Sequence, residues 1–278
     1  MNPPSVPTVL TNIIERKRQE VASARQACPL SAMRRQAEEM SACRPFAAAL
    51  KKRTEGGDVA VIAEIKRASP SQGIIRPSYD PKAIAKSYEQ AGAACLSVLT
   101  DTDFFAGKAQ DLIDARAACQ LPVLRKDFMV DPFQLYQARA MGADCILLIV
   151  ACLDRHELHD MAVLARELGM DVLIEVHSEA ELERALAVDS PLVGINNRNL
   201  HTFEVSLQTT LALCHRVPND RLVIAESGIH HSADITRLVD HDVRAFLIGE
   251  SCMRAEDPGQ QLRQLCAGAM GHRGAEED

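Results

Sequence analysis

The stretch Asp58-Val59-Ala60-Val61-Ile62-Ala63-Glu64-Ile65-Lys66 combines a short apolar run with two charges at its end. Its β-branched start is typical of a buried strand. Glu64 and Lys66 are two residues apart, so their side chains share one face of that strand. Burying an acid and a base costs several kcal/mol unless they pair with each other or meet a ligand. The stretch therefore predicts either a structural ion pair or one edge of a binding site.

The same succession of apolar run, polar turn and amphipathic helix recurs along the rest of the chain. Eight runs are expected as strands, at 59–65, 94–99, 122–125, 145–150, 172–176, 192–195, 222–225 and 245–248. Eight strand–helix units at this spacing are typical of a (β/α)8 TIM barrel, whose parallel strands are buried on both faces. The alternative, a doubly wound open sheet, usually has a glycine-rich first turn, and residues 66–71 do not provide one. We therefore predict an α/β fold of the TIM-barrel class.

Size and composition limit the organisation and the partners of the chain. The 278 residues are expected to divide into an N-terminal helical extension packing on the barrel (1–55), the barrel (56–270) and a disordered tail (271–278). A net charge of −7 and 4% aromatic residues argue against nucleic acid as the partner. No apolar run approaches the ~20 residues of a membrane helix. Nine cysteines without a C-x-x-C pair predict a reduced, cytoplasmic protein that has no disulfide and no zinc site.

Charged and polar residues follow the predicted strands at the ends where barrel enzymes carry their chemistry. These are Glu64, Lys66, Lys126, Glu175, Asn196, Arg198 and Glu226. A purely stabilising core would be apolar, so two Lys and three Glu converging on one rim are difficult to explain as structure alone. The pattern predicts an acid–base site at the mouth of the barrel.

The ends of the seventh and eighth predicted strands carry small residues, in Ser227-Gly228 and in Gly249-Glu250-Ser251. The loops after these two strands are the usual phosphate site of a barrel, because exposed backbone N–H groups can surround an anion there. Each glycine could instead serve only a tight turn. Two such turns in the two expected places favour a phosphate site, with the backbone of Glu250 facing the phosphate and its carboxylate turned away.

Taken together, these motifs resemble the indole-3-glycerol phosphate synthase family. The matching stretches cover nearly the whole chain, at 63–71, 98–101, 124–128, 142–144, 173–177, 194–200, 225–229 and 246–251. The resemblance implies a phosphorylated substrate, 1-(2-carboxyphenylamino)-1-deoxyribulose 5-phosphate, which is cyclised to indole-3-glycerol phosphate with loss of CO₂ and water. It implies no metal and no organic cofactor. Other enzymes of tryptophan biosynthesis are the macromolecular partners to expect.

The resemblance also implies roles for individual residues. Lys126 would be the acid of ring closure and Glu175 its proton-shuttling partner. Lys66 would hold the substrate carboxylate and assist dehydration, with Glu64 and Asn196 orienting it and the ribulose hydroxyls. Which Lys serves which step stays open. The residues that would bind the phosphate are Ser69, Ser227, Gly228, Gly249 and Glu250, and Arg198 and Glu226 would support the site. The anthranilate ring needs an apolar slot, and the candidates, each of which could equally be ordinary core, are Phe105, Phe128, Leu147, Ile149 and Leu200. Residues 67–79, with Gly73 as a hinge, would form a lid.

Two other functions compete with this hypothesis. Another phosphosugar barrel enzyme, of the phosphoribosylanthranilate isomerase type, would need a Cys/Asp acid–base pair in place of the Lys/Glu cluster. A non-catalytic barrel that binds a phosphorylated metabolite would need fewer buried charges than this chain carries. We therefore favour the synthase.

Overall fold

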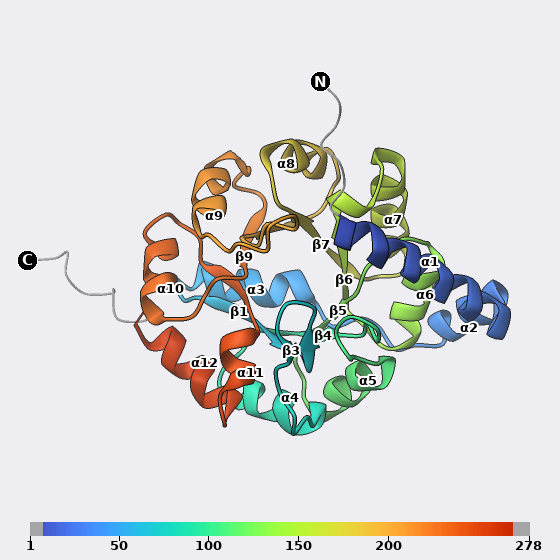
Figure 1. Cartoon of the computed structure of the whole chain (residues 1–278), viewed down its shortest axis with the longest axis horizontal. Coiled ribbons are helices and arrows are strands. Elements are labelled where there is room, and N and C mark those ends of the chain that lie inside the picture. The colour runs from blue at the N-terminus through green and yellow to red at the C-terminus, as the bar shows by residue number, and fades with distance from the viewer. Residues whose placement is uncertain (1–7, 269–278) are drawn as a thin grey trace, which may run out of the picture.

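A computed structural model of the chain describes residues 8–268 and shows a closed barrel of eight strands surrounded by helices (Figure 1). Around the barrel the strands follow the order β1-β10-β9-β8-β7-β6-β5-β4, and every neighbouring pair is parallel. The strands are β1 (Ala60–Ile65), β4 (Cys95–Leu99), β5 (Val123–Lys126), β6 (Cys145–Ile149), β7 (Asp171–Val176), β8 (Leu192–Asn196), β9 (Leu222–Glu226) and β10 (Ala245–Ile248). The predicted (β/α)8 fold is confirmed. The predicted tail at 271–278 lies outside the described residues.

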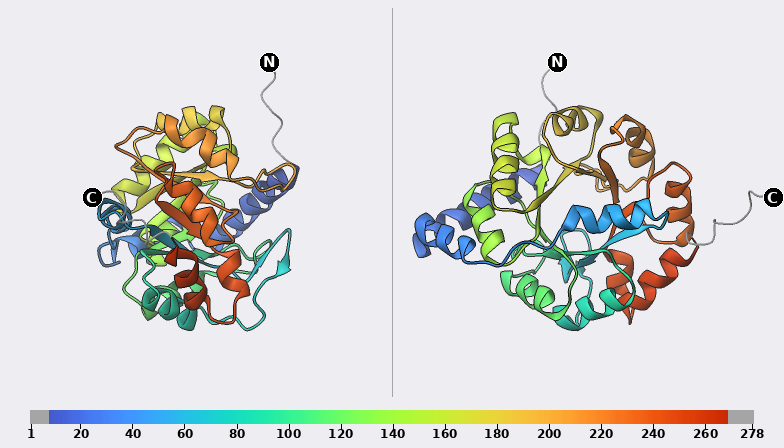
Figure 2. Two further views of the ribbon diagram at one scale, coloured as in Figure 1. Left: turned by 90° about the vertical axis from the view of Figure 1, so that its left-hand side faces the viewer. Right: turned by 180° about the vertical axis from the view of Figure 1, so that it is seen from behind.

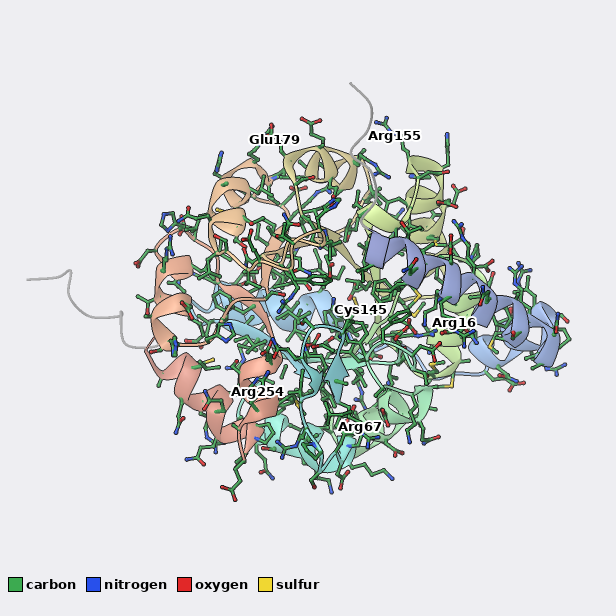
Figure 3. All side chains as sticks on the ribbon, in the orientation of Figure 1. Arg16, Arg67, Cys145, Arg155, Glu179 and Arg254 are labelled. Atoms are coloured by element: carbon green, nitrogen blue, oxygen red, sulfur yellow. The ribbon has the colours of Figure 1, made fainter. Side chains whose placement is uncertain are left out.

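The outer ring consists of amphipathic helices that bury one face against the strands. Its members are α4 (Pro81–Gln90), α5 (Ala109–Ala118), α6 (Phe133–Ala140), α7 (Arg155–Glu167), α8 (Glu179–Leu186), α9 (Gln208–Leu213), α10 (Ser232–Val239), α12 (Pro258–Ala267) and the short α11 (Glu250–Arg254). Helix α4 illustrates the local rules, since Asp80 caps the N–H groups of Lys82 and Ala83 and Pro81 occupies the first turn. Figure 3 shows the charged side chains of Arg155 and Glu179 on the outside of this ring.

Three helices precede the barrel, and two of them lie at its opposite ends. They are α1 (Thr8–Ala27), α2 (Leu30–Glu38) and α3 (Phe46–Glu55). Helix α3 crosses the end where the strands begin (Figure 2, right), and the N–H of Ala47 donates to Asp171 Oδ2 at 2.8 Å. Helix α1 lies on the other side, in front of the barrel in Figure 1. The helical extension therefore reaches the end of the barrel where the strands finish.

Between β1 and α4 the chain forms a small antiparallel hairpin of β2 (Ala68–Ser69) and β3 (Gly73–Ile74). Gly73 has a φ of +63° at its turn, a left-handed conformation that glycine adopts without strain. The hairpin stands out on the same side of the barrel as α1 (Figure 2, left). It occupies the segment for which the sequence predicted a lid. Its motion stays a prediction.

None of the helices within residues 8–268 has the length and the apolar character that crossing a membrane requires.

Candidate active site

A cavity opens at the carboxyl ends of the strands, and every residue predicted for the site lines it. It gathers the Lys/Glu cluster, the small residues after β9 and β10, and the apolar side chains proposed for the ring slot. The barrel topology accounts for this convergence, because parallel strands bring their carboxyl ends to one rim. Residues from all eight strands or their following loops thus share one cavity.

Lys126, at the end of β5, lies at the centre of the charged cluster. Its Nζ donates to Glu175 Oε2 at 2.9 Å and lies 3.4 Å from Glu226 Oε2. Burial by itself would lower the pKa of Lys126, but the charges of Glu175, Glu226 and Glu64 outweigh burial and raise that pKa above its usual value. Lys126 is therefore a charged ammonium at neutral pH, held where a hydrogen bond to a substrate oxygen is stronger than in water.

The pKa values of Glu175 and Glu226 shift in opposite directions within this cluster. Although burial disfavours the charged form of Glu175, Lys126 and His177 hold the pKa of its carboxyl well below the usual range. Burial raises the pKa of Glu226 to about 8 despite the opposing effect of Lys126, and the charge of Glu175 adds to the rise. At neutral pH Glu175 is thus a carboxylate and Glu226 a neutral acid. Two acids with separated pKa values next to one ammonium can donate and accept protons at the same centre.

The pair predicted from the first strand is also present. Lys66 Nζ lies 2.6 Å from Glu64 Oε2, and both side chains line the cavity. Gly249 lies directly beside this carboxylate, and a Cβ at position 249 would collide with Glu64. The glycine predicted for phosphate binding thus also leaves room for the acid of β1.

Asn196 connects the charged cluster with the loop after β9. Its Nδ2 donates to Glu175 Oε1 at 3.2 Å, while its Oδ1 accepts from Ser227 Oγ at 2.9 Å and from the N–H of Arg198 at 3.0 Å. These bonds orient the amide, because only this assignment of oxygen and nitrogen satisfies all three partners. The Glu175 carboxylate and the loop after β9 are therefore connected through one side chain.

The predicted phosphate region contains two consecutive residues with left-handed φ values and one acid that two arginines contact. Ser227 and Gly228 have φ values of +64° and +82°, and left-handed φ is uncommon for a serine. A Cβ at Gly228 would meet Val205 Cγ1 at 2.8 Å. The Glu250 carboxylate accepts from Arg254 Nε at 3.1 Å and lies 3.7 Å from Arg198 Nη2. Two arginines thus counter the charge of the acid that accompanies Gly249.

The apolar side of the cavity has a contribution that the sequence did not predict. Phe105 and Phe128 lie with ring centroids 6.2 Å apart, and Leu147, Ile149 and Leu200 extend the same wall. Helix α1 completes it with Val9, Leu10 and Ile13. The sequence predicted a helical extension in this region. It could not identify the surface that its apolar face covers.

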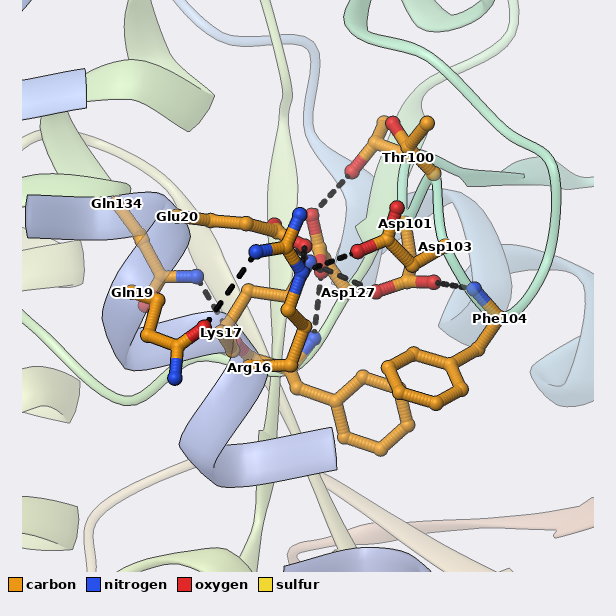
Figure 4. Close-up of polar contacts among 12 residues, drawn as sticks. Arg16, Lys17, Gln19, Glu20, Thr100, Asp101, Asp103, Phe104, Asp127 and Gln134 are labelled. Carbon is orange, nitrogen blue, oxygen red and sulfur yellow. Dashed lines mark hydrogen bonds and ion pairs between the residues drawn. The ribbon is translucent and has the colours of Figure 1, made fainter. Parts of the chain in front are cut away.

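Lys17 of α1 was missed as well, and it anchors that helix to two strand ends (Figure 4). Its side chain is 4% exposed, and its Nζ lies 2.8 Å from Asp101 Oδ2 and 3.0 Å from Asp127 Oδ1. Arg125 and Thr100 bond the other oxygen of Asp127 at 3.0 and 2.7 Å. Because Asp127 follows Lys126 directly, this buried network joins α1 to the strand that carries the central lysine.

Two sequence comparisons match this chain to one protein family. The family model described as indole-3-glycerol phosphate synthase matches residues 10–265. An indole-3-glycerol phosphate synthase from Polaromonas sp. (strain JS666) is 57% identical over 257 residues, which cover 92% of this chain and 97% of that protein.

Solved structures support the fold. A tryptophan synthase subunit alpha from Legionella pneumophila str. Paris has a TM-score of 0.59 at 12% identity, covering 81% of this chain and 98% of its own. An N-acetylmannosamine-6-phosphate 2-epimerase from Clostridium perfringens has a TM-score of 0.58 at 12% identity, and the match covers 77% of this chain and 93% of the epimerase chain. At such identities the likeness extends to the barrel alone. The sequence matches, which span almost the whole chain, identify this protein as a member of the indole-3-glycerol phosphate synthase family.

Proposed function

We propose that the cavity at the barrel mouth carries out the reaction of this family with Lys126 as the acid of ring closure. Members of the family are decarboxylating lyases of tryptophan biosynthesis. The substrate would be 1-(2-carboxyphenylamino)-1-deoxyribulose 5-phosphate, whose phosphate, sugar and aromatic ring match the polar end, the charged centre and the apolar wall of the cavity. The observation that carries the assignment of the acid is the contact of Lys126 with Glu175 at 2.9 Å and Glu226 at 3.4 Å.

In the first step the ring carbon that bears the carboxylate attacks the C2 ketone of the ribulose chain. The new C–C bond uses an aromatic π pair, and the carbonyl π pair moves to oxygen, which takes a proton from Lys126 Nζ. Loss of CO₂ then returns its bonding pair to the ring. Lys66, beside Glu64, would hold the carboxylate until it leaves. An ammonium placed at the developing alkoxide acts as a general acid and as an electrostatic stabiliser.

The second half of the reaction is a dehydration. The hydroxyl on the former ketone carbon leaves as water after receiving a proton, and a base removes one proton from the new five-membered ring. Glu175 suits the base because it is ionised, and Glu226 suits the donor because its raised pKa, about 8, keeps it protonated near neutrality. Asn196 would orient Glu175, and Ser69, Ser227, Gly228, Gly249 and Glu250 would bind the phosphate.

The competing functions find less support in the cavity. A Cys/Asp pair is needed by the isomerase-type alternative, and no Cys occurs among the described residues that line this space. A barrel that only binds a phosphorylated metabolite has no use for five clustered ionisable groups. We also propose, on the same family membership, a cytoplasmic location and an association with other enzymes of tryptophan biosynthesis.

The test is turnover by purified protein, followed by the absorbance and fluorescence of the indole product. Lys126→Met should lower kcat by roughly 10²–10⁴-fold, the range of a missing general acid, with the fold retained. Lys82→Met is a matched control, because Lys82 is on the outer helix α4 and its side chain is 57% exposed. Near-normal turnover by Lys126→Met would remove Lys126 from this role. No product from the wild-type protein over a broad pH range would favour the binding-only barrel.

A further inference from the structure

His177 lies immediately beyond β7, between the cavity and the outside of the barrel. Its Nε2 is 3.3 Å from Glu175 Oε1, and its Nδ1 is 3.2 Å from Glu181 Oε2. The exposed fraction of the side chain rises along this series, from 3% for Glu175 to 9% for His177 and 21% for Glu181. His177 is not among the described residues that line the cavity. The three groups therefore form a line from the catalytic carboxylate to the molecular surface.

Local structure fixes this arrangement. Glu175 and His177 are two residues apart at the end of β7, so their side chains point to the same side of the chain. Ser178 caps α8 by accepting from the N–H of Glu181, which places Glu181 in the first turn of the helix. From there its carboxylate also accepts from the backbone N–H of His177 at 2.8 Å. The imidazole thus has a hydrogen-bond partner at Nδ1 and an ion-pair partner at Nε2, both from its own segment of the chain.

The proposed reaction consumes one proton in every turnover. Ring closure places a proton on the ketone oxygen, and loss of CO₂ neither takes up nor releases one. Dehydration takes up one proton at the leaving hydroxyl and releases one from the ring. The balance leaves one proton to be supplied from solvent, and Lys126 must recover it before the next ring closure. The site is buried, with Lys126 14% exposed and Glu226 1% exposed, so the proton needs a route.

We propose that Glu181 and His177 form the route by which a solvent proton returns to Lys126 through Glu175. In this scheme His177 gives the proton on Nε2 to Glu175 Oε1 while Nδ1 receives one that enters at Glu181. Before this, the ring proton that Glu175 took up during dehydration has passed through Lys126 Nζ to Glu226, whose Oε2 lies 3.4 Å from that nitrogen. The Glu175 carboxyl then turns so that the proton received from His177 faces the neutral Lys126 amine and passes to it, and each group ends as it began. His177 touches no reacting atom and acts through Glu175, so it is a positioning residue. The inference rests on the proposed function.

The charges around His177 suit this task. Glu175 of β7 and Glu181 of α8 face it directly, and although burial opposes the charged form, these two carboxylates raise the pKa of His177 to about 9. The thiol of Cys152 lies near both carboxylates, and burial raises its pKa so that it stays neutral. His177 therefore carries its proton at neutral pH. Once Lys126 has lost its charge, the main cause that holds the pKa of Glu175 low is absent, and Glu175 can accept a proton.

A relay and a purely structural brace differ in one measurable respect. In a single turnover with enzyme in excess, Lys126 begins charged, so the relay is not needed before product forms. In repeated turnover it is needed in every cycle. A brace that only orients Glu175 would affect both experiments equally. The informative quantity is therefore the ratio of the single-turnover rate to kcat.

The experiment compares His177→Gln with wild-type protein at pH 8 in dilute buffer, using the indole product as the signal. Gln keeps hydrogen-bonding capacity at this position but cannot carry a proton between two carboxylates. We expect the ratio to rise by at least about tenfold, within the scale of a lost acid–base step, and to fall again when imidazole buffer is added. His156→Gln, an exposed histidine on α7, should leave the ratio unchanged.

Glu181→Gln provides a second variant, with Glu183→Gln on the same helix as its control because the Glu183 side chain is 68% exposed. Glu181→Gln should raise the ratio in the same direction. Equal loss of both rates in His177→Gln, or no loss of either, would overturn the relay. If the wild-type protein forms no indole product, the proposed function itself fails, and that outcome is distinct from an unchanged ratio in an active enzyme.

Discussion

At the scale of single residues, the site is governed by how its buried charges balance. Lys66 and Lys126 face Glu64, Glu175 and Glu226, which would leave one surplus negative charge if every group were ionised. Neither carboxylate oxygen of Glu226 receives a hydrogen bond from the described residues, and its pKa is raised to about 8. A proton on Glu226 removes the surplus. The neutral acid that dehydration requires follows first from the burial of Glu226 and then from this balance.

The raised pKa of Glu226 predicts a pH-dependent stability. The folded value, about 8, lies above the ordinary value of 4.5, so the folded state keeps a proton that the unfolded chain has lost between these limits. Stability from this group is therefore present at low pH and declines as pH rises toward 8. Glu226→Gln cannot titrate, so its Tm minus that of the wild type should become more positive from pH 5 to pH 8. A constant difference in thermal melts, as expected for the exposed control Glu204→Gln, would contradict this.

At the scale of elements, the loop after β9 owes its shape to Gly228. Gly228→Ala adds a Cβ that meets Val205 Cγ1, whereas Gly169→Ala adds one that meets no atom within 4 Å. Both glycines have left-handed φ values, +82° and +77°, so the backbone strain is matched. We expect Gly228→Ala to raise KM about tenfold or more with kcat little changed, because a displaced loop loses hydrogen bonds to a charged phosphate. An unchanged KM would place the phosphate elsewhere.

Helix α1 is attached to the barrel through charge as well as through apolar contacts. Lys17 is the cation shared by Asp101 and Asp127, and its removal would leave those buried carboxylates poorly compensated. Breaking a buried ion pair in this way costs about 3–5 kcal/mol. We therefore expect Lys17→Met to lower the free energy of unfolding by about that amount in denaturant titrations. The exposed neighbour Arg18→Met should change it by less than about 0.5 kcal/mol. A loss that small for Lys17→Met would argue against the anchor.

At the scale of the whole molecule, the periodic strand–helix units determine the barrel, and the barrel determines which residues meet. For that reason sequence alone located Lys66, Lys126, Glu175 and Asn196 around one cavity. It could not identify Lys17, which stands in the charged run Glu15-Arg16-Lys17-Arg18 and reads as a solvent-exposed residue. Burial of that lysine depends on how α1 packs against the barrel, and no local sequence pattern predicts that packing.

Sequence analysis gave Glu226 only a supporting role and gave His177 no role, for a related reason. At a strand end any charged or polar side chain is plausible, so the local sequence does not show what such a residue does. Their pKa values of about 9 and about 8 depend on burial and on charges that come from other strands and helices. Protonation states can therefore be predicted only from the assembled mouth of the barrel, whereas the fold can be predicted from the sequence.

The central claim is that the ketone of the substrate meets Lys126 at this mouth. The most direct test is a crystal structure of the protein with the alcohol made by reducing that ketone, which cannot cyclise. We expect the alcohol oxygen within about 2.7–3.2 Å of Lys126 Nζ, the phosphate against Ser227, Gly228 and Gly249, and the aromatic ring against Phe105 and Phe128. An alcohol oxygen more than about 5 Å from Lys126 and bonded to another acid would contradict the account.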